Sequence, residues 1–135
     1  VMLNTVLMCL AMNVYHEARS DTMIGQYAVA HVVMNRVMSD RFPNSVCDVV
    51  KQGYEKGKHK CQFSWYCDGR SDRPRNLAVY NRTVDVARQV LAGDIADPTG
   101  GANMFHNTRV RPRWARVAKP TARIGPHRFY YLRRR

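Results

Sequence analysis

The chain opens with the stretch VMLNTVLMCLAMNVYHEAR (residues 1–19), which contains neither Gly nor Pro. Its apolar residues at spacings of four, three and four are Leu3, Leu7, Leu10 and Val14. This spacing predicts one face of an amphipathic helix. The stretch lacks the leading positive charges and the small-residue cleavage site of a secretory signal, so we interpret it as a helix of the fold.

The same spacing carries a carboxylate onto or beside the apolar face. Adding three to Val14 gives Glu17, and adding four gives Ala18. Loss of water around a carboxyl group favours its protonated form, so we predict a raised pKa for Glu17, as a general acid requires. The alternative is a Glu at a helix end that turns to solvent or pairs with Arg19. Position makes Glu17 a candidate catalytic acid.

Length and composition predict one globular domain. The chain has 135 residues, of which 45% are hydrophobic and 24% charged. This size supports a single core, and these fractions are ordinary for a globular protein. No apolar run approaches the roughly 18–20 residues that a membrane-spanning helix requires.

The charge is strongly basic and unevenly distributed. There are 22 Lys and Arg against 10 Asp and Glu, which gives a formal net charge of +12, and no acidic residue follows Asp97. Such a protein is attracted to polyanions, whether nucleic acid, anionic cell-wall polymer or anionic lipid headgroups. The alternative is a basic surface that serves solubility, although +12 exceeds what solubility needs.

The four cysteines do not decide the compartment. Cys9 lies close to the apolar stripe, and we interpret it as a buried thiol. A disulfide between Cys61 and Cys67 would close a short loop, and pairing of Cys47 with either of them is an alternative. A zinc site built from His59, Cys61 and Cys67 is disfavoured, because no Cys-x-x-Cys pair exists and no fourth ligand is evident.

Two further helices are predicted in the first half of the chain. The N-cap candidates Ser20, Asp21 and Thr22 precede a helix that runs through Val37. Its residues with the spacing of one face, which we expect to pack on the first helix, are Ile24, Ala28, Val32 and Asn35. Ser45 is predicted to cap a short helix over residues 46–51.

Residues 53–76 show no helical period and contain the aromatic residues Phe63, Trp65 and Tyr66 close together. So long a loop in a small domain is usually functional or disordered, and its aromatic residues argue against disorder. Aromatic faces suit sugar rings and stacked bases. The alternative is that these rings fill a minor core beneath a disulfide-closed loop.

The rest of the chain predicts one more helix and a small β element. The residues with helical spacing, followed by Gly93 as a C-cap, are Leu77, Tyr80, Val84, Ala87 and Leu91. A turn is expected at residues 97–101, and short strands at Met104–Asn107 and residues 128–132. The expected fold class is therefore α+β, a compact and mainly helical single domain.

Several short blocks occur in an order that matches a known family. They are YHEAR (15–19), GQYAVA (25–30), VMNRV (33–37), RFP (41–43), CDVV (47–50), CQFS (61–64), GGA (100–102), RPRWA (111–115) and IGPHRFY (124–130). Together they closely resemble the SleB-type cell wall hydrolases, which were first known from spore-cortex lysis and also occur in bacteriophage endolysins. The resemblance spans nearly the whole chain.

The resemblance implies a lysozyme-like catalytic domain over residues 1–135. Such a domain cuts peptidoglycan between N-acetylmuramic acid and N-acetylglucosamine, generally as a lytic transglycosylase. The catalytic acid of the family is the Glu of its Glu-Ala-Arg motif, here Glu17. The family's Gln-Phe-Ser block, which lies beside the cleft, corresponds to Gln62, Phe63 and Ser64.

One family block departs from its pattern here. Where the family has Gly-Ala-Thr-His-Tyr-His, Met104 and Phe105 replace a His and a Tyr, and His106 remains. Trp65 and Tyr130 complete the predicted substrate-binding set. No metal and no cofactor is expected. We expect a monomer that acts at the bacterial cell wall, in the periplasm or outside the cell, where its basic C-terminal region holds the anionic wall or the outer-membrane surface.

The number of suitable acids favours a transglycosylase. Glycoside hydrolysis usually takes two carboxylates, but the only glutamates are Glu17 and Glu55. Glu55 lies among lysines, so we expect it to be solvated, and Asp21 is better explained as an N-cap. The alternative within the same class is a muramidase that pairs Glu17 with Asp21 or Asp68.

Two readings from other classes are also open. A nucleic-acid-binding module would place the basic tail on phosphates and stack Trp65 or Trp114 on bases. It would leave Glu17 without a role, and the sequence contains no known nucleic-acid-binding motif, so we expect no specific nucleic acid. A wall-binding domain without catalysis is the other reading.

Overall fold

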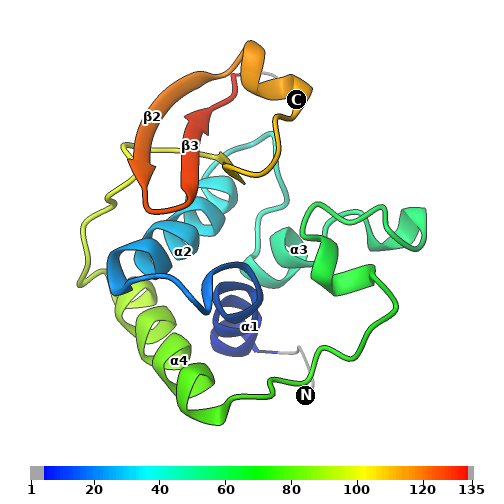
Figure 1. The fold of residues 1–135 in the computed structure, drawn as a ribbon, viewed down its shortest axis with the longest axis vertical. Coiled ribbons are helices and arrows are strands. Elements are labelled where there is room, and N and C mark those ends of the chain that lie inside the picture. Colours follow the sequence, from blue (N-terminus) through cyan, green and yellow to red (C-terminus); the bar gives the residue numbers. More distant parts are fainter. Residues whose placement is uncertain (1–4, 134–135) are drawn as a thin grey trace.

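Four α-helices and a three-stranded sheet form the part of the chain that the structure, a computed structural model, describes, namely residues 5–133. The predicted stripe residue Leu3 and the basic residues Arg134 and Arg135 lie outside these residues. Helix α1 lies at the centre with the other helices around it, and the sheet packs beyond α2 (Figure 1). The predicted α+β class is confirmed.

Helix α1 (Val6–Ala18) forms the centre of the hydrophobic core. Thr5 caps it by accepting a hydrogen bond from the Met8 amide at 3.1 Å. Of the predicted stripe, Leu10 and Val14 are fully buried. The helix packs on α2 (Met23–Val37), α3 (Val46–Val50) and α4 (Leu77–Leu91). Its burial on three sides fixes the position of its last turn.

Helix α2 is buried on two faces, which corrects the predicted packing. Ala28 and Val32 pack against Ala102 and Phe129 on the side of the sheet, whereas the neighbouring Val29 belongs to the core around α1. The predicted stripe therefore does not face the first helix, and its first member, Ile24, is 54% exposed.

The N-cap of α2 is Thr22, whose hydroxyl accepts a hydrogen bond from the Gly25 amide. Asp21 is therefore not the cap. A Cβ on Gly25 would lie 3.0 Å from the Cβ of Asp21, so the absence of a side chain there leaves room for the Asp21 side chain.

Two disulfides correct the predictions for the cysteines. Cys9 of α1 is bonded to Cys47 of α3, so it is not a free thiol, and Cys47 does not pair within the long loop. Cys61 is bonded to Cys67, which confirms that alternative. The zinc alternative thereby loses both of its thiolates. Burial of Cys9 in the core gave no indication of its partner 38 residues away.

The segment 53–76 is ordered by its aromatic residues. It contains two short 3₁₀ turns, Tyr54–Lys56 and Ser64–Cys67. The Trp65 indole N–H donates to the Asn13 side-chain oxygen of α1 at 2.8 Å, and both side chains are buried. The loop is thus attached to the central helix by one buried hydrogen bond.

Helix α4 has the predicted extent, with Ala92 as C-cap and Gly93 following at a φ of 79°. The residues that it buries are Thr83, Val86, Ala87 and Val90, whereas Leu77 of the predicted stripe is exposed. The buried face is therefore rotated from the predicted one.

The sheet is antiparallel, with strands β1 (Met104–Asn107), β3 (His127–Tyr131) and β2 (Lys119–Ile124) in that order. Strand β2 was not predicted, because its charged residues and Pro120 do not alternate as a half-buried strand would. Among the described residues, no helix has both the length and the apolar character needed to cross a bilayer.

Candidate active site

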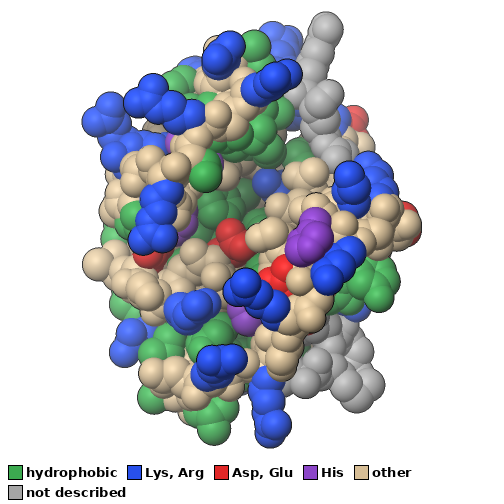
Figure 2. Space-filling view, turned by 45° about the vertical axis from the view of Figure 1, so that its right-hand side comes forward, with side chains coloured by type: hydrophobic (Ala, Val, Ile, Leu, Met, Phe, Trp, Pro, Cys, Tyr) green, Lys and Arg blue, Asp and Glu red, His purple; other side chains and the backbone are tan. Residues whose placement is uncertain are grey.

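Three neighbouring cavities meet at the end of α1, and His16 lines all of them. The one between α1 and the sheet, about 430 Å³, is here called the Glu17 cleft. Its lining residues are His16, Glu17, Arg36, Gln62, Phe63, Met104, Phe105, His106, Asn107, Val110, Pro112, Trp114 and His127. Figure 2 shows a hollow with hydrophobic walls on one face, acidic and His side chains at its lower edge, and Lys and Arg side chains around it.

Glu17 lies at the inner end of the Glu17 cleft, in the last turn of α1. Its side chain is partly buried: it keeps some contact with solvent inside the cleft and is surrounded by protein elsewhere. This burial raises the pKa of Glu17 to about 7, and the positive charge of Arg36 opposes the rise. The predicted rise is confirmed. A carboxyl group with this pKa both donates and accepts a proton readily near neutral pH.

Arg36 of α2 lies on the floor of the cleft. Its Nε donates to the Asn103 carbonyl at 2.8 Å, and its guanidinium lies 5.0 Å from the centre of the Phe63 ring. The side chain is buried, so its charge acts on Glu17 with little screening by solvent. No sequence motif predicted a role for Arg36, although an Arg on a largely apolar helix was a visible signal.

The position of the last turn of α1 is fixed by contacts from three directions. The Gln26 side chain donates to the Ala18 carbonyl at 3.2 Å. The Tyr15 hydroxyl accepts from the Arg75 amide, and His16 Nε2 lies 2.8 Å from the Asp72 carbonyl. The His16 ring also stacks on Trp65, with centroids 4.5 Å apart. Glu17 is therefore carried by a rigid support.

The opposite side of the cleft is a cluster of aromatic rings on the sheet. His106 of β1 stacks on Tyr130 of β3, and its Nε2 lies 2.9 Å from the Tyr130 hydroxyl. Trp114, in the 3₁₀ turn Arg113–Arg116, packs edge-on against both rings. Trp114 and His106 line the cleft and are partly exposed, so they present aromatic surface to a ligand that enters it.

Asp21 and His127 form a buried polar contact beside Glu17. Asp21 Oδ2 lies 2.9 Å from His127 Nδ1, and the two side chains are 11% and 6% exposed. Burial raises the pKa of Asp21, against the attraction of His127, and lowers the pKa of His127, against the attraction of Asp21. The contact joins the turn after α1 to β3. No sequence signal linked residues so far apart.

The structure brings four of the predicted site residues to one cleft: Glu17, Gln62, Phe63 and His106. Trp65 lines the adjacent cavity instead, and Tyr130 lies behind His106. Ser64 is exposed and lines none of the three cavities. Met104 and Phe105, which replace a His and a Tyr of the family pattern, line the cleft.

Comparison with known proteins shows that this chain is similar to members of one family. The family model described as Cell Wall Hydrolase matches residues 20–130. The spore cortex-lytic enzyme of Halalkalibacterium halodurans is 30% identical over 123 residues, 89% of this chain and 33% of the relative. That of Bacillus subtilis is 32% identical over 130 residues, 93% of this chain and 37% of the relative. The chain thus spans about a third of the length of these relatives.

Two solved structures share the fold. The catalytic domain of the Bacillus cereus SleB protein has a TM-score of 0.68 and 28% identity, with 93% of this chain and 88% of that one covered. The catalytic domain of the germination-specific lytic transglycosylase SleB from Bacillus anthracis has a TM-score of 0.71 and 28% identity, with 96% and 99% covered. The fold is therefore that of these catalytic domains.

Proposed function

The chain belongs to the cell wall hydrolase family, and from that premise we propose that it degrades peptidoglycan as a lytic transglycosylase. The proposed bond lies between N-acetylmuramic acid and N-acetylglucosamine. The observation that carries the proposal is that Glu17 is the one carboxylic acid among the described residues that line the Glu17 cleft, and its pKa is about 7. The relatives, which are spore cortex-lytic enzymes and a lytic transglycosylase, support it.

In the proposed reaction, the Glu17 carboxylic acid donates its proton to the glycosidic oxygen while the bond from that oxygen to C1 of the muramic acid breaks. The resulting carboxylate then accepts the proton of the C6 hydroxyl of the same sugar, and O6 bonds to C1. The strand ends in a 1,6-anhydro ring, no water enters, and Glu17 is protonated again. One acid near neutral pKa performs both transfers.

The walls of the cleft suit a sugar chain. Trp114, Phe105 and His106 offer ring faces, and the exposed Gln62 offers an amide at the same opening. Phe63 is buried and packs against Phe105. Sugar rings combine apolar faces with hydroxyl edges, so a mixed wall of this kind binds both. We propose these residues as substrate contacts. Trp65 would support His16 and Tyr130 would support His106, each by stacking on its ring. Ser64 is exposed and would contact only a part of the ligand outside the cleft.

A muramidase is the rival chemistry within the same family. It needs a second carboxylate close to the first. Asp21 lies beside a neighbouring cavity that Glu17 also lines, but its carboxylate contacts His127. Asp68 lines the more distant cavity and accepts a hydrogen bond from the Arg70 amide at 2.9 Å. Both candidates are thus engaged elsewhere, which favours the transglycosylase.

The basic C-terminal region supports a further part of the proposal, attachment to an anionic wall or outer-membrane surface. Among the described residues, its exposed basic side chains are those of Arg109, Arg111, Arg113, Arg116, Lys119, Arg123 and Arg133. Attachment through exposed charges weakens with salt. Binding of an inactive variant to sacculi should therefore fall between low and high ionic strength, and equal binding at both would contradict this anchor. The proposed place of action is the cell wall, in the periplasm or outside the cell.

The experiment that tests the function is identification of the sugar ends released from purified sacculi by mass spectrometry. We expect anhydromuramic ends, one water lighter than the reducing ends that a muramidase would leave. Glu17→Gln should keep the fold and lose the activity, because an amide neither donates nor accepts this proton. Glu55→Gln is the matched control, because Glu55 is exposed and outside the cleft.

Each rival reading has its own outcome in this experiment. Reducing ends would replace the transglycosylase by a muramidase. Release of sugars by Glu17→Gln at the wild-type rate would remove Glu17 from the mechanism. A wall-binding domain would release nothing in either form, and a nucleic-acid-binding module would shift DNA in a gel without acting on sacculi.

A further inference from the structure

The largest of the three cavities lies next to the Glu17 cleft and has no role in the mechanism above. Its volume is about 670 Å³. We call it the arginine cavity, because four of its lining residues are Arg19, Arg70, Arg73 and Arg75. His16 lines both this cavity and the Glu17 cleft. A ligand in the cleft that carries a side branch could therefore place the branch in the arginine cavity.

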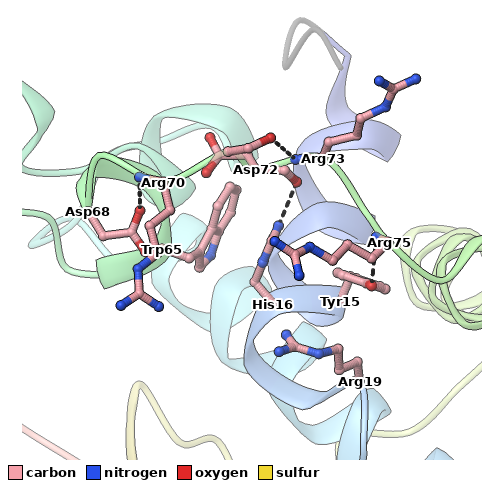
Figure 3. A pocket seen from close by; sticks show the side chains of 10 residues that line it. Tyr15, His16, Arg19, Trp65, Asp68, Arg70, Asp72, Arg73 and Arg75 are labelled. Carbon is pink, nitrogen blue, oxygen red and sulfur yellow. Dashed lines mark hydrogen bonds between the residues drawn. The ribbon is translucent and has the colours of Figure 1, made fainter.

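The walls of the arginine cavity are held by hydrogen bonds to the backbone. The Arg75 amide donates to the Tyr15 hydroxyl at 3.2 Å. The Asp72 carbonyl contacts His16 at 2.8 Å, and the Arg70 amide donates to Asp68 Oδ1 at 2.9 Å. The loop that supplies three of the arginines is thus attached to α1, as Figure 3 shows. The cavity is a built feature and does not depend on a free loop.

The cavity carries charges of both signs. Besides its four arginines, it is lined by two aspartates, Asp68 and Asp72. In Figure 3 the side chains of Arg19 and Arg75 extend toward His16, whereas that of Arg73 extends away from the others. An arginine binds a carboxylate through two parallel hydrogen bonds, and a carboxylate binds an amine. Phosphate would engage only the arginines, whereas a ligand with several carboxylates and an amine engages charges of both signs.

We propose that the arginine cavity receives the peptide stem of the muramic acid whose glycosidic bond lies at Glu17. This inference rests on the proposed function. The stem branches from the lactyl group of that sugar, and it is a short peptide that carries carboxylates and a free amine. The excess of arginines takes the carboxylates, and Asp68 or Asp72 takes the amine. The enzyme thus selects strands with peptide-substituted muramic acid over strands without stems.

The test compares cleavage of intact glycan strands with cleavage of the same strands after an amidase has removed their stems. We expect wild type to cleave the substituted strands at least tenfold faster, measured as kcat/KM. Arg75→Glu should bring this ratio below threefold, because it reverses the charge that extends toward His16. This substitution replaces the side chain and keeps the hydrogen bond from the backbone amide at position 75 to the Tyr15 hydroxyl. Arg82→Glu, an exposed arginine of α4 outside the cavity, is the charge-matched control and should keep the ratio.

A binding measurement keeps the inference testable if Arg75→Glu fails to fold. The soluble tripeptide L-alanyl-γ-D-glutamyl-diaminopimelate is titrated into the Glu17→Gln protein while the NMR signal of the Trp65 indole N–H is followed. The peptide should shift this signal, because Trp65 lines the cavity. Inorganic phosphate, which carries no amine for the two aspartates, should shift it much less.

The two levels of the proposal fail in different ways. Equal cleavage of both kinds of strand, with no shift of the Trp65 signal, would overturn the stem site and leave the transglycosylase standing. An equal response to phosphate would also overturn it. No cleavage of either strand would overturn the proposed function, and the titration would then decide the stem site alone.

Discussion

The two sides of the Glu17 cleft are built on different principles. The helical side, α1 with α2, α3 and α4, is a close-packed core in which Leu10, Met12 and Val14 have no exposed surface. The sheet side is held by strand pairing and ring contacts, and every residue of β1 is partly exposed. Glu17, the proposed proton donor, lies on the packed side, and most of the proposed sugar contacts lie on the half-open side. Packing fixes the position of Glu17, while the proposed binding surface keeps freedom to adjust.

The largest expected effect tests whether the helical side depends on its covalent link. The double variant Cys9→Ala with Cys47→Ala should lose about 4 kcal/mol of unfolding free energy, because the bond closes a loop with a separation of 38 residues. Urea denaturation measures this loss. Cys61→Ala with Cys67→Ala is the matched control and should lose about 2 kcal/mol, because its separation is 6 residues. Equal losses would contradict the chain-entropy explanation.

The next effect tests the connection between the two sides. Asp21→Ala leaves the buried ring of His127, which is neutral at pH 7 because its pKa is lowered, without its polar partner, so we expect a loss of up to about 3 kcal/mol in urea denaturation at that pH. Asp85→Ala breaks a pair with Arg88 in which both side chains are more than half exposed, and it should cost less than about 0.5 kcal/mol. If both cost the same, the contact of Asp21 with His127 does not join the sides.

A third effect concerns the unfolding free energy that is lost because the Glu17 carboxyl group is buried on the helical side. A pKa of about 7 in place of 4.5 corresponds to up to about 3 kcal/mol of lost stability. Below pH 4.5 both the folded and the unfolded states hold the proton. Between 4.5 and 7 the unfolded state releases it first, so stability falls as pH rises, and the whole loss is present above pH 7.

Glu17→Gln should therefore be more stable than wild type at pH 8 by up to about 3 kcal/mol, and nearly equal to it at pH 4. Urea denaturation at the two pH values measures the difference. Glu55→Gln should change stability at neither pH, since Glu55 is exposed. A Glu17→Gln protein that gains nothing at pH 8 would show that the carboxyl group is not desolvated.

The smallest effect is expected on the sheet side. Trp114→Ala removes one ring face from the cleft, so KM for sacculus fragments should rise about tenfold, or about 1.4 kcal/mol, with kcat within about twofold. Steady-state kinetics measures both constants. Tyr54→Ala, an exposed aromatic outside the cleft, should change neither. A large fall in kcat for Trp114→Ala would mean that the sheet side also positions the reacting groups.

The same contrast explains how much could be predicted from the sequence. The place of Glu17 followed from helical spacing, because α1 is one continuous local element. Thr22, Ser45 and the strand Met104–Asn107 were likewise readable from local signals. The correspondence of Gln62 with the cleft came from the family resemblance and not from spacing.

The missed features join residues that are distant along the chain. Asp21 meets His127, Cys9 meets Cys47, and Arg36 contacts Asn103, and no periodicity connects such partners. Strand β2 was missed because its pairing with β3, and not its own pattern, makes it a strand. The sheet side of the cleft is assembled almost entirely from such long-range contacts, so it was the less predictable side.

The disulfide between Cys9 and Cys47 makes the stability of this protein depend on the redox state of its environment. Thiols stay reduced in most bacterial cytoplasms and are oxidised outside them. A chain still inside the cell that makes it would lack both crosslinks and the stability they add. The chain reaches its full stability only in an oxidising environment, where both disulfides form. The proposed wall-degrading activity would therefore last longest outside the cytoplasm.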